Sequence, residues 1–175
     1  MPVALLGFDC GRALLALTSS FAGDGHGGKK RQLLWHGIAL FLLGLVTGLV
    51  EQKFTNVRMG LAAHLEGVMN GTFLLALGAV WQEVNLTPRI KAAAYWAVLA
   101  GTYGNWMVTT LAAILGTAAL SPISAAGHSA PAWQEAIVAT GFVAIGSAII
   151  AASVLVLWGL RSSAGAKPLS RYSGL

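Results

Sequence analysis

Four long apolar segments constrain the fold of this chain more than any other feature. They cover roughly residues 32–50, 60–82, 91–116 and 134–160, with shorter and more polar stretches between them. Each is close to or above the roughly 20 residues that a helix needs to cross the hydrocarbon core of a bilayer. Because lipid offers the backbone no hydrogen bonds, the segments are predicted to be helices. They are too long for strands and lack an alternation of period two.

The composition agrees with a membrane protein. Of the 175 residues, 56% are hydrophobic and only 10% are charged, whereas a soluble domain carries about 25% charged residues. The formal net charge is +5, but the basic residues flank the apolar segments and form no basic–aromatic stripe, so no nucleic-acid partner is expected. Cys10 is the single cysteine, which excludes an internal disulfide. We therefore predict an all-α membrane protein, a bundle of four transmembrane helices in residues 32–160.

The flanking charges predict how the helices are oriented. With four spans both termini lie on one side, and nine basic residues share that side, against Lys53 and Arg58 on the other. The nine are Arg12, Lys29, Lys30, Arg31, Arg89, Lys91, Arg161, Lys167 and Arg171. Both termini are therefore predicted to be cytoplasmic, and Trp35, Trp81, Trp96 and Trp158 fall at the cytoplasmic ends, where indole rings anchor. Residues 1–31 are expected to be an extension that ends in a flexible glycine-rich linker, and residues 161–175 a cytoplasmic tail.

Polar side chains interrupt the second apolar segment in the stretch NVRMGLAAHLEGVMNG, residues 56–71. In the predicted topology, His64, Glu66 and Asn70 lie in the outer third of that helix. Tyr103 and Asn105 reach about mid-membrane on the next helix. The loop before the last helix carries further polar residues on the same side, namely His128, Gln134 and Glu135. Since ionisable groups inside a membrane are costly and usually face the interior, a functional site is the first hypothesis.

Helical geometry separates these side chains onto two faces. At about 100° per residue, Glu66 and Asn70 share a face, whereas His64 lies about 160° from Glu66. Neither face suits lipid, so the helix is expected to lie between two partners. The histidine's face also carries a strip of three glycines, Gly60, Gly67 and Gly71.

Each of these features has a structural interpretation beside the functional one. The glycine strip is typical of close helix packing through Gly67 and Gly71, or it is the bed of a flat cofactor with His64 as axial ligand. Glu66 is a site residue or a structural carboxylic acid. The side chains of Asn70, Asn105, Tyr103 and Trp106 either belong to a site or serve interhelical hydrogen bonding and packing.

Three segments resemble the signature segments of hydroxylaminobenzene mutases: NVRMGLAAHLEGVMNGTFLLALG, GTYGNWMVTTLAAILG and GHSAPAWQEAIV. These membrane enzymes convert hydroxylaminobenzene to 2-aminophenol, and the resemblance covers roughly residues 32–160. More distantly, the chain resembles styrene oxide isomerases, whose second helix has a histidine followed by Asn-Gly, here His64 and then Asn70 and Gly71. Those isomerases are homotrimers with haem b at the subunit interfaces. Gly101 and Thr109 stand where they have an aspartate and a tyrosine, which argues against an epoxide substrate.

The resemblance implies an isomerase of the bacterial inner membrane that shifts a hydroxyl group within an aryl hydroxylamine. It implies a homotrimer with haem b ligated by His64 at subunit interfaces, where the glycine strip would lie. Glu66 would donate a proton or stabilise a cation, while Asn70, Tyr103 and Asn105 would orient the substrate.

Two other functions stay open at this stage. One is a small proton-coupled transporter of aromatic or cationic compounds, with Glu66 as its proton site. The other is a haem electron-transfer subunit, which would need a second axial ligand. His36 lies towards the opposite membrane face from His64, and His128 lies in a loop, so both are poor partners.

Overall fold

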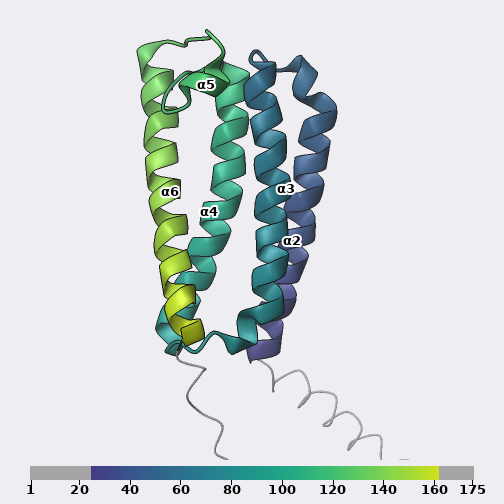
Figure 1. Ribbon diagram of the computed structural model, residues 1–175, viewed down its shortest axis with the longest axis vertical. Helices are drawn as coiled ribbons and strands as arrows, with labels where there is room; N and C mark the ends of the chain where they lie inside the picture. Colours follow the sequence, from purple (N-terminus) through teal and green to yellow (C-terminus); the bar gives the residue numbers. More distant parts are fainter. Residues whose placement is uncertain (1–24, 162–175) are drawn as a thin grey trace, which may run out of the picture.

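The structure, a computed structural model that describes residues 25–161, contains four long helices of alternating direction (Figure 1). They are α2 (Gly25–Val50), α3 (Val57–Val80), α4 (Pro88–Leu115) and α6 (Ala132–Arg161). Shorter elements join them, namely the 3-10 turns η1 (Glu51–Lys53) and η2 (Trp81–Glu83) and the single helical turn α5 (Pro122–Ala125). Each long helix is long and apolar enough to cross a membrane. The predicted all-α membrane fold is confirmed, and the orientation of the termini stays a prediction.

The four helices pack in the order in which they occur in the chain. α3 lies between α2 and α4, and α6 packs on α4 (Figure 1). Direct contact between α2 and α4 is slight, and α6 hardly touches α2 or α3. The bundle is therefore an open row, and α6 has the least buried surface, with 17% of its apolar window inside the molecule.

Local sequence signals explain most helix ends. Asn56 precedes α3 as its N-cap, because its Oδ1 accepts a hydrogen bond from the Met59 backbone at 3.0 Å. α4 begins with Pro88 and is followed by the C-cap Gly116, whose φ of 69° is left-handed. α2 begins at Gly25 rather than at residue 32, so residues 25–31 are helical instead of forming the predicted linker. The rest of the predicted extension, residues 1–24, and the tail beyond Arg161 lie outside the described residues.

Two apolar clusters hold the row together, one towards each end. The smaller cluster, on the side of α5, is centred on Met59, Ala112, Ala113 and Val138. The larger cluster joins all four long helices near the opposite end. It includes Trp81, which is only 2% exposed and stacks edge-on against Tyr95 with ring centroids 6.0 Å apart. Trp81 is therefore a core residue rather than the interface anchor that its position predicted.

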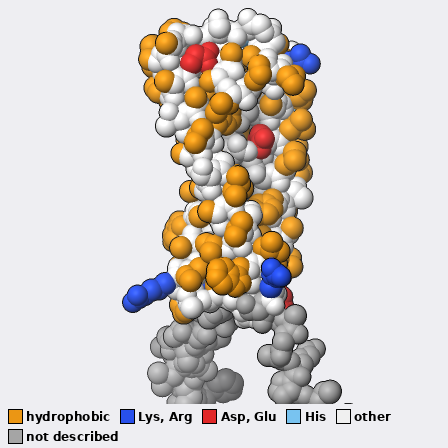
Figure 2. Space-filling model, turned by 60° about the vertical axis from the view of Figure 1, so that its left-hand side comes forward, with side chains coloured by type: hydrophobic (Ala, Val, Ile, Leu, Met, Phe, Trp, Pro, Cys, Tyr) orange, Lys and Arg blue, Asp and Glu red, His pale blue; other side chains and the backbone are white. Residues whose placement is uncertain are grey.

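The outer surface is apolar along the length of the helices. In Figure 2 hydrophobic side chains cover this face, and the basic side chains lie near its two ends. An acidic side chain is visible partway along it. Such a surface suits lipid or protein neighbours and leaves a polar group at mid-height to be explained.

Candidate functional site

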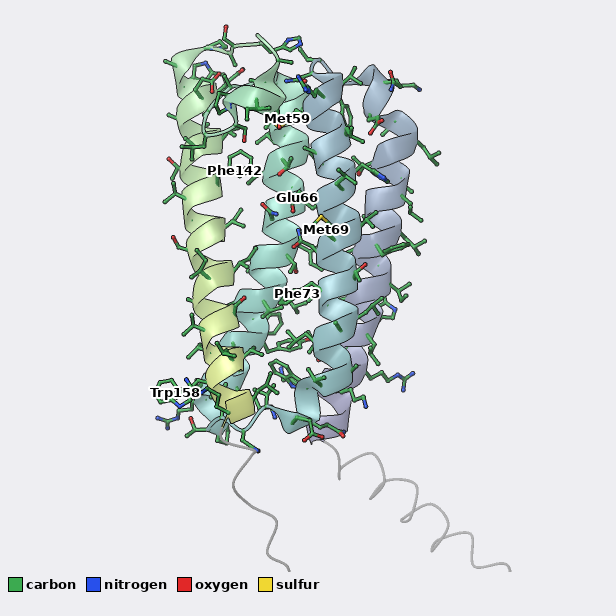
Figure 3. All side chains as sticks on the ribbon, viewed as in Figure 1. Met59, Glu66, Met69, Phe73, Phe142 and Trp158 are labelled. Atoms are coloured by element: carbon green, nitrogen blue, oxygen red, sulfur yellow. The ribbon has the colours of Figure 1, made fainter. Side chains whose placement is uncertain are left out.

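Glu66 is the centre of a polar cluster between α3 and α4. Its Oε2 accepts hydrogen bonds from the side-chain amide of Asn105 on α4 and from that of Asn70 at 3.1 Å. All three side chains are half-buried. Figure 3 shows Glu66 partway along α3, with Met59 towards α5 and Phe73 in the other direction. Three of the four predicted catalytic residues therefore lie together.

The Glu66 carboxylate has unused hydrogen-bond acceptor capacity. Oε2 of Glu66 is occupied by two amide donors, but Oε1 accepts no hydrogen bond from the described residues. Both donors are neutral amides, so neither brings a positive charge to the carboxylate. The cluster thus offers one fixed and one open acceptor oxygen at mid-height of the row.

The helices bring these residues together by simple geometry. Glu66 and Asn70 are four residues apart and share a face of α3. Asn105 arrives from the antiparallel neighbour α4, whose Gly104 lets Ile145 of α6 approach: a Cβ on Gly104 would lie 2.8 Å from the Ile145 Cδ1. α4 therefore fits closely between α3 and α6 at this level.

Two further positions of α4 contribute no acid or phenol to the cluster. A Cβ on Gly101 would overlap with the Ile149 side chain of α6. The hydroxyl of Thr109 donates to the Asn105 carbonyl oxygen at 2.8 Å, within the helix. The site around Asn105 therefore lacks the aspartate and the tyrosine that styrene oxide isomerases have at these two positions.

Tyr103, the fourth predicted catalytic residue, does not join the cluster. Its hydroxyl oxygen lies 3.2 Å from Nδ1 of His36 and 3.3 Å from the His36 carbonyl oxygen, both on α2. Tyr103 and Asn105 lie on different sides of α4, because two residues along a helix turn the side chain by about 200°. The role of Tyr103 in orienting the substrate stays a prediction. Tyr103 therefore faces α2, whereas Asn105 faces α3.

His64 lies on the opposite face of α3 from Glu66 and packs against α2. Its Nδ1 is 2.8 Å from the Gly44 carbonyl oxygen, so Nδ1 carries the proton and donates it. Nε2 then holds the lone pair and makes no hydrogen bond to the described residues. A backbone carbonyl on one ring nitrogen is the usual support of a metal-ligating histidine.

The surroundings of His64 are apolar. The described residues contain no group of three or more His, Cys, Asp or Glu side chains that could hold a metal ion, so a site built from protein ligands alone is not found there. Leu61, one turn before His64, and Leu45, next to Gly44, are exposed and apolar. A lone histidine donor among apolar neighbours is compatible with an apolar macrocycle that it would ligate.

The glycine strip, in contrast, is covered by the chain itself. A Cβ on Gly67 would overlap with the Gly44 Cα, and one on Gly71 would lie 2.5 Å from the Phe41 backbone nitrogen. A Cβ on Gly60 would lie 3.0 Å from the Glu51 Cβ. The expectation that Gly60, Gly67 and Gly71 form the bed of a flat cofactor is therefore corrected. These glycines serve the close packing of α3 on α2 and η1.

Other polar residues have structural tasks that the sequence did not reveal. Trp106 bridges α4 and α2, because its Nε1 donates to the buried Thr47 hydroxyl at 3.0 Å. The Glu135 carboxylate accepts backbone hydrogen bonds of 2.7–3.0 Å from residues 118, 119 and 130, which fastens the loop around α5. Neither Glu135 nor the exposed His128 joins the Glu66 cluster. A lone threonine or a glutamate near a helix start carries no signal for such pairings.

The chain is similar to known proteins over most of its length. Residues 29–161 match the family model described as styrene oxide isomerase. Over 134 residues, 76% of this chain and 82% of the relative, it is 45% identical to the hydroxylaminobenzene mutase HabB of Ectopseudomonas oleovorans. It is 39% identical to the hydroxylaminobenzene mutase HabA of the same organism over 125 residues, 71% of this chain and 93% of the relative. No solved structure matches the chain. Both resemblances inferred from the sequence motifs are thereby confirmed.

Proposed function

We propose that this chain, which belongs to the styrene oxide isomerase family and is an enzyme of the isomerase class, converts hydroxylaminobenzene or a related aryl hydroxylamine to 2-aminophenol. In this reaction the N–O bond breaks and a C–O bond forms at the ortho carbon. The ring loses a proton there and the nitrogen gains one. Atoms and electrons balance, so neither a reductant nor a second substrate is needed.

The observation that carries the proposal is the Glu66 carboxylate at mid-height of the helices. Cleavage of the N–O bond leaves positive charge on the nitrogen and the ring. A carboxylate with one fixed and one open oxygen can stabilise that charge or carry the proton from the ortho carbon to the nitrogen. The open oxygen, Oε1 of Glu66, is the one available to the substrate.

The neighbours of Glu66 support the same chemistry. The amides of Asn70 and Asn105 hold the carboxylate in place, and their own oxygens are available to orient an N–H or O–H of the substrate. Met59 and Phe142 belong to the apolar cluster on the α5 side of Glu66, and Phe73 lies on its other side (Figure 3). Apolar neighbours of this kind would limit the access of water, which would otherwise capture the cation at another ring position.

For the cofactor we propose haem b, with His64 as its ligand. When bound, it would supply a Lewis-acidic iron to the departing hydroxyl oxygen. The chain's own contribution is the imidazole, fixed by Gly44 so that Nε2 presents its lone pair. Because His64 contacts α2 and Glu66 contacts α4, the two residues would serve one site only between copies of the chain, which supports an oligomer with shared sites. The oligomer that we propose is a homotrimer.

The test is a product assay on the purified protein. Hydroxylaminobenzene, with no added reductant, should give 2-aminophenol identified by chromatography and mass, and an absorption spectrum should show a Soret band. Recovery of unchanged substrate from haem-loaded protein would refute the mutase proposal. The transporter alternative predicts substrate-dependent proton flux in proteoliposomes without chemical conversion.

A further inference from the structure

Tyr103 and His36 line a pocket that the proposed active site does not use. The pocket lies between α2 and α4, towards the end of the row opposite α5, and has a volume of about 570 Å³. Its lining residues are Trp35, His36, Trp96, Leu99, Ala100 and Tyr103. Since Tyr103 and Asn105 point to different neighbours of α4, the pocket is on a different side of that helix from the Glu66 cluster.

Aromatic rings form most of its walls. The His36 ring meets the Trp35 ring edge-on at a centroid distance of 5.1 Å and the Tyr103 ring edge-on at 5.7 Å. Trp35 and Trp96 stand at its margin and are 66% and 64% exposed. Walls of this kind match the flat faces and edges of another small aromatic ring.

The polar groups of the pocket present an acceptor. The Tyr103 hydroxyl has one proton, which it donates to the His36 carbonyl oxygen at 3.3 Å. The 3.2 Å contact between the Tyr103 oxygen and Nδ1 of His36 is then a bond donated by Nδ1–H. In the tautomer that satisfies both contacts, the lone pair of His36 is on Nε2, which has no hydrogen-bond partner among the described residues.

From these features we propose that the pocket binds a small aromatic molecule with an N–H or O–H donor, such as an arylamine, a phenol or an arylhydroxylamine. The donor would bond to Nε2 of His36 while the ring lies among Trp35, Trp96 and Tyr103. A lipid chain would fill the volume but offer no donor to Nε2. The natural ligand would be the substrate or product of the mutase, and this identification rests on the proposed function. The binding of an aromatic donor by the pocket does not depend on that function.

The test is photolabelling with 3-azidoaniline, mapped by peptide mass spectrometry on the full-length protein in nanodiscs. Wild-type protein should be labelled within residues 95–104. Aniline should compete, and N,N-dimethylaniline, which has no N–H, should compete less. Ala100→Phe should abolish this label, because Ala100 lines the pocket and its exposed side chain leaves room for a ring that fills it.

The matched control is Ala151→Phe on α6. Ala151 is exposed and outside the pocket, and it lies at the level of Ala100, since Ile149 contacts Gly101. The label should persist in this variant. Tyr103→Phe keeps the ring but releases His36 from its fixed tautomer. The aniline concentration for half-competition should then rise about three- to tenfold, the scale of one hydrogen bond.

Each contrary result has a definite meaning. A full label in correctly sized Ala100→Phe, or equal competition by the two anilines, would overturn the proposal. Displacement by phosphatidylglycerol but not by aniline would identify a lipid site and overturn it too. If Ala100→Phe does not assemble, the Tyr103→Phe competition decides. A product assay on the same wild-type sample reports separately on the mutase. If the wild-type protein is labelled but forms no 2-aminophenol, only the proposed function is refuted.

Discussion

Glu66 and His64 are two residues apart on α3, yet their side chains contact different neighbouring helices. Glu66 accepts hydrogen bonds from Asn70 and Asn105, while His64 donates one to the Gly44 carbonyl oxygen of α2. Each side chain keeps one atom without a partner among the described residues, Oε1 and Nε2 respectively. Polar groups within membrane helices are costly and usually mark a site, so two open atoms on one such helix favour function over packing.

Replacing Glu66 by Gln tests the carboxylate alone. Gln keeps the shape and still accepts the bonds from Asn70 and Asn105, so haem content and oligomer size should be unchanged. Turnover of hydroxylaminobenzene should fall about 10²-fold, the usual scale of acid–base assistance. Glu83→Gln, at an exposed position of η2, is the control and should leave turnover unchanged. Turnover within a factor of about two of wild type in Glu66→Gln would assign Glu66 a structural role.

The proposed ligand can be tested without removing it. A Cβ on Gly48 would lie 2.6 Å from Nδ1 of His64, so Gly48→Ala should displace the imidazole and lower the Soret absorbance per protein. His64→Ala should abolish that absorbance. Gly28→Ala lies on the same helix, where an added Cβ meets nothing within 4 Å, and should behave as wild type. Full haem loading of His64→Ala would place the ligand elsewhere.

At the scale of helices, the pair α2 and α3 is the most closely packed part of the molecule. Backbone meets backbone where Gly67 faces Gly44 and where Gly71 faces Gly37 and Phe41. Without a hydrophobic drive between helices in lipid, such close approach supplies the packing that holds them together. It also brings Gly44 and Gly48 to the ring of His64.

Enlarging Gly67 should therefore weaken the α2–α3 pair. Gly67→Ala should lower the free energy of unfolding in detergent by about 1–3 kcal/mol, the usual cost of overpacking, and Gly67→Leu by more. Gly146→Ala on α6, where the added methyl meets nothing within 4 Å, should not be destabilised. Equal stabilities of Gly67→Ala and wild type would mean that α2 and α3 are less closely packed than described.

The sequence predicted the helices better than it predicted which helix faces contact each other. Four apolar spans and the i, i+4 spacing of Glu66 and Asn70 sufficed for the helices and for most of the polar cluster. The contact surface of the glycine strip was left open, because a bare helix surface suits a helix and a macrocycle equally well. The contact of Tyr103 with α2 was not predicted, since apolar helices carry polar residues too sparsely to show which neighbour each face meets. The start of α2 was missed because glycines usually weaken a helix.

The whole molecule is an open row that leaves α6 largely uncovered. Its Glu66 and His64 faces cannot meet within one chain, because α3 lies between them. Coexpression tests whether copies share a site. Mixed oligomers of His64→Ala and Glu66→Gln chains should regain part of the activity that each variant lacks alone, because some interfaces then combine an intact His64 with an intact Glu66. No recovery in oligomers verified to be mixed would show that each chain holds a complete site.

The row also repeats the order of synthesis. Each long helix after α2 packs on the long helix that was synthesised just before it, so it can dock as soon as it has been made. While α4 is still being made, Glu66 has its first donor, Asn70, from its own helix, and the second, Asn105, comes only with α4. The two hydrogen bonds to the carboxylate would therefore form one after the other, and a translational pause between α3 and α4 would prolong the state in which Glu66 has a single donor.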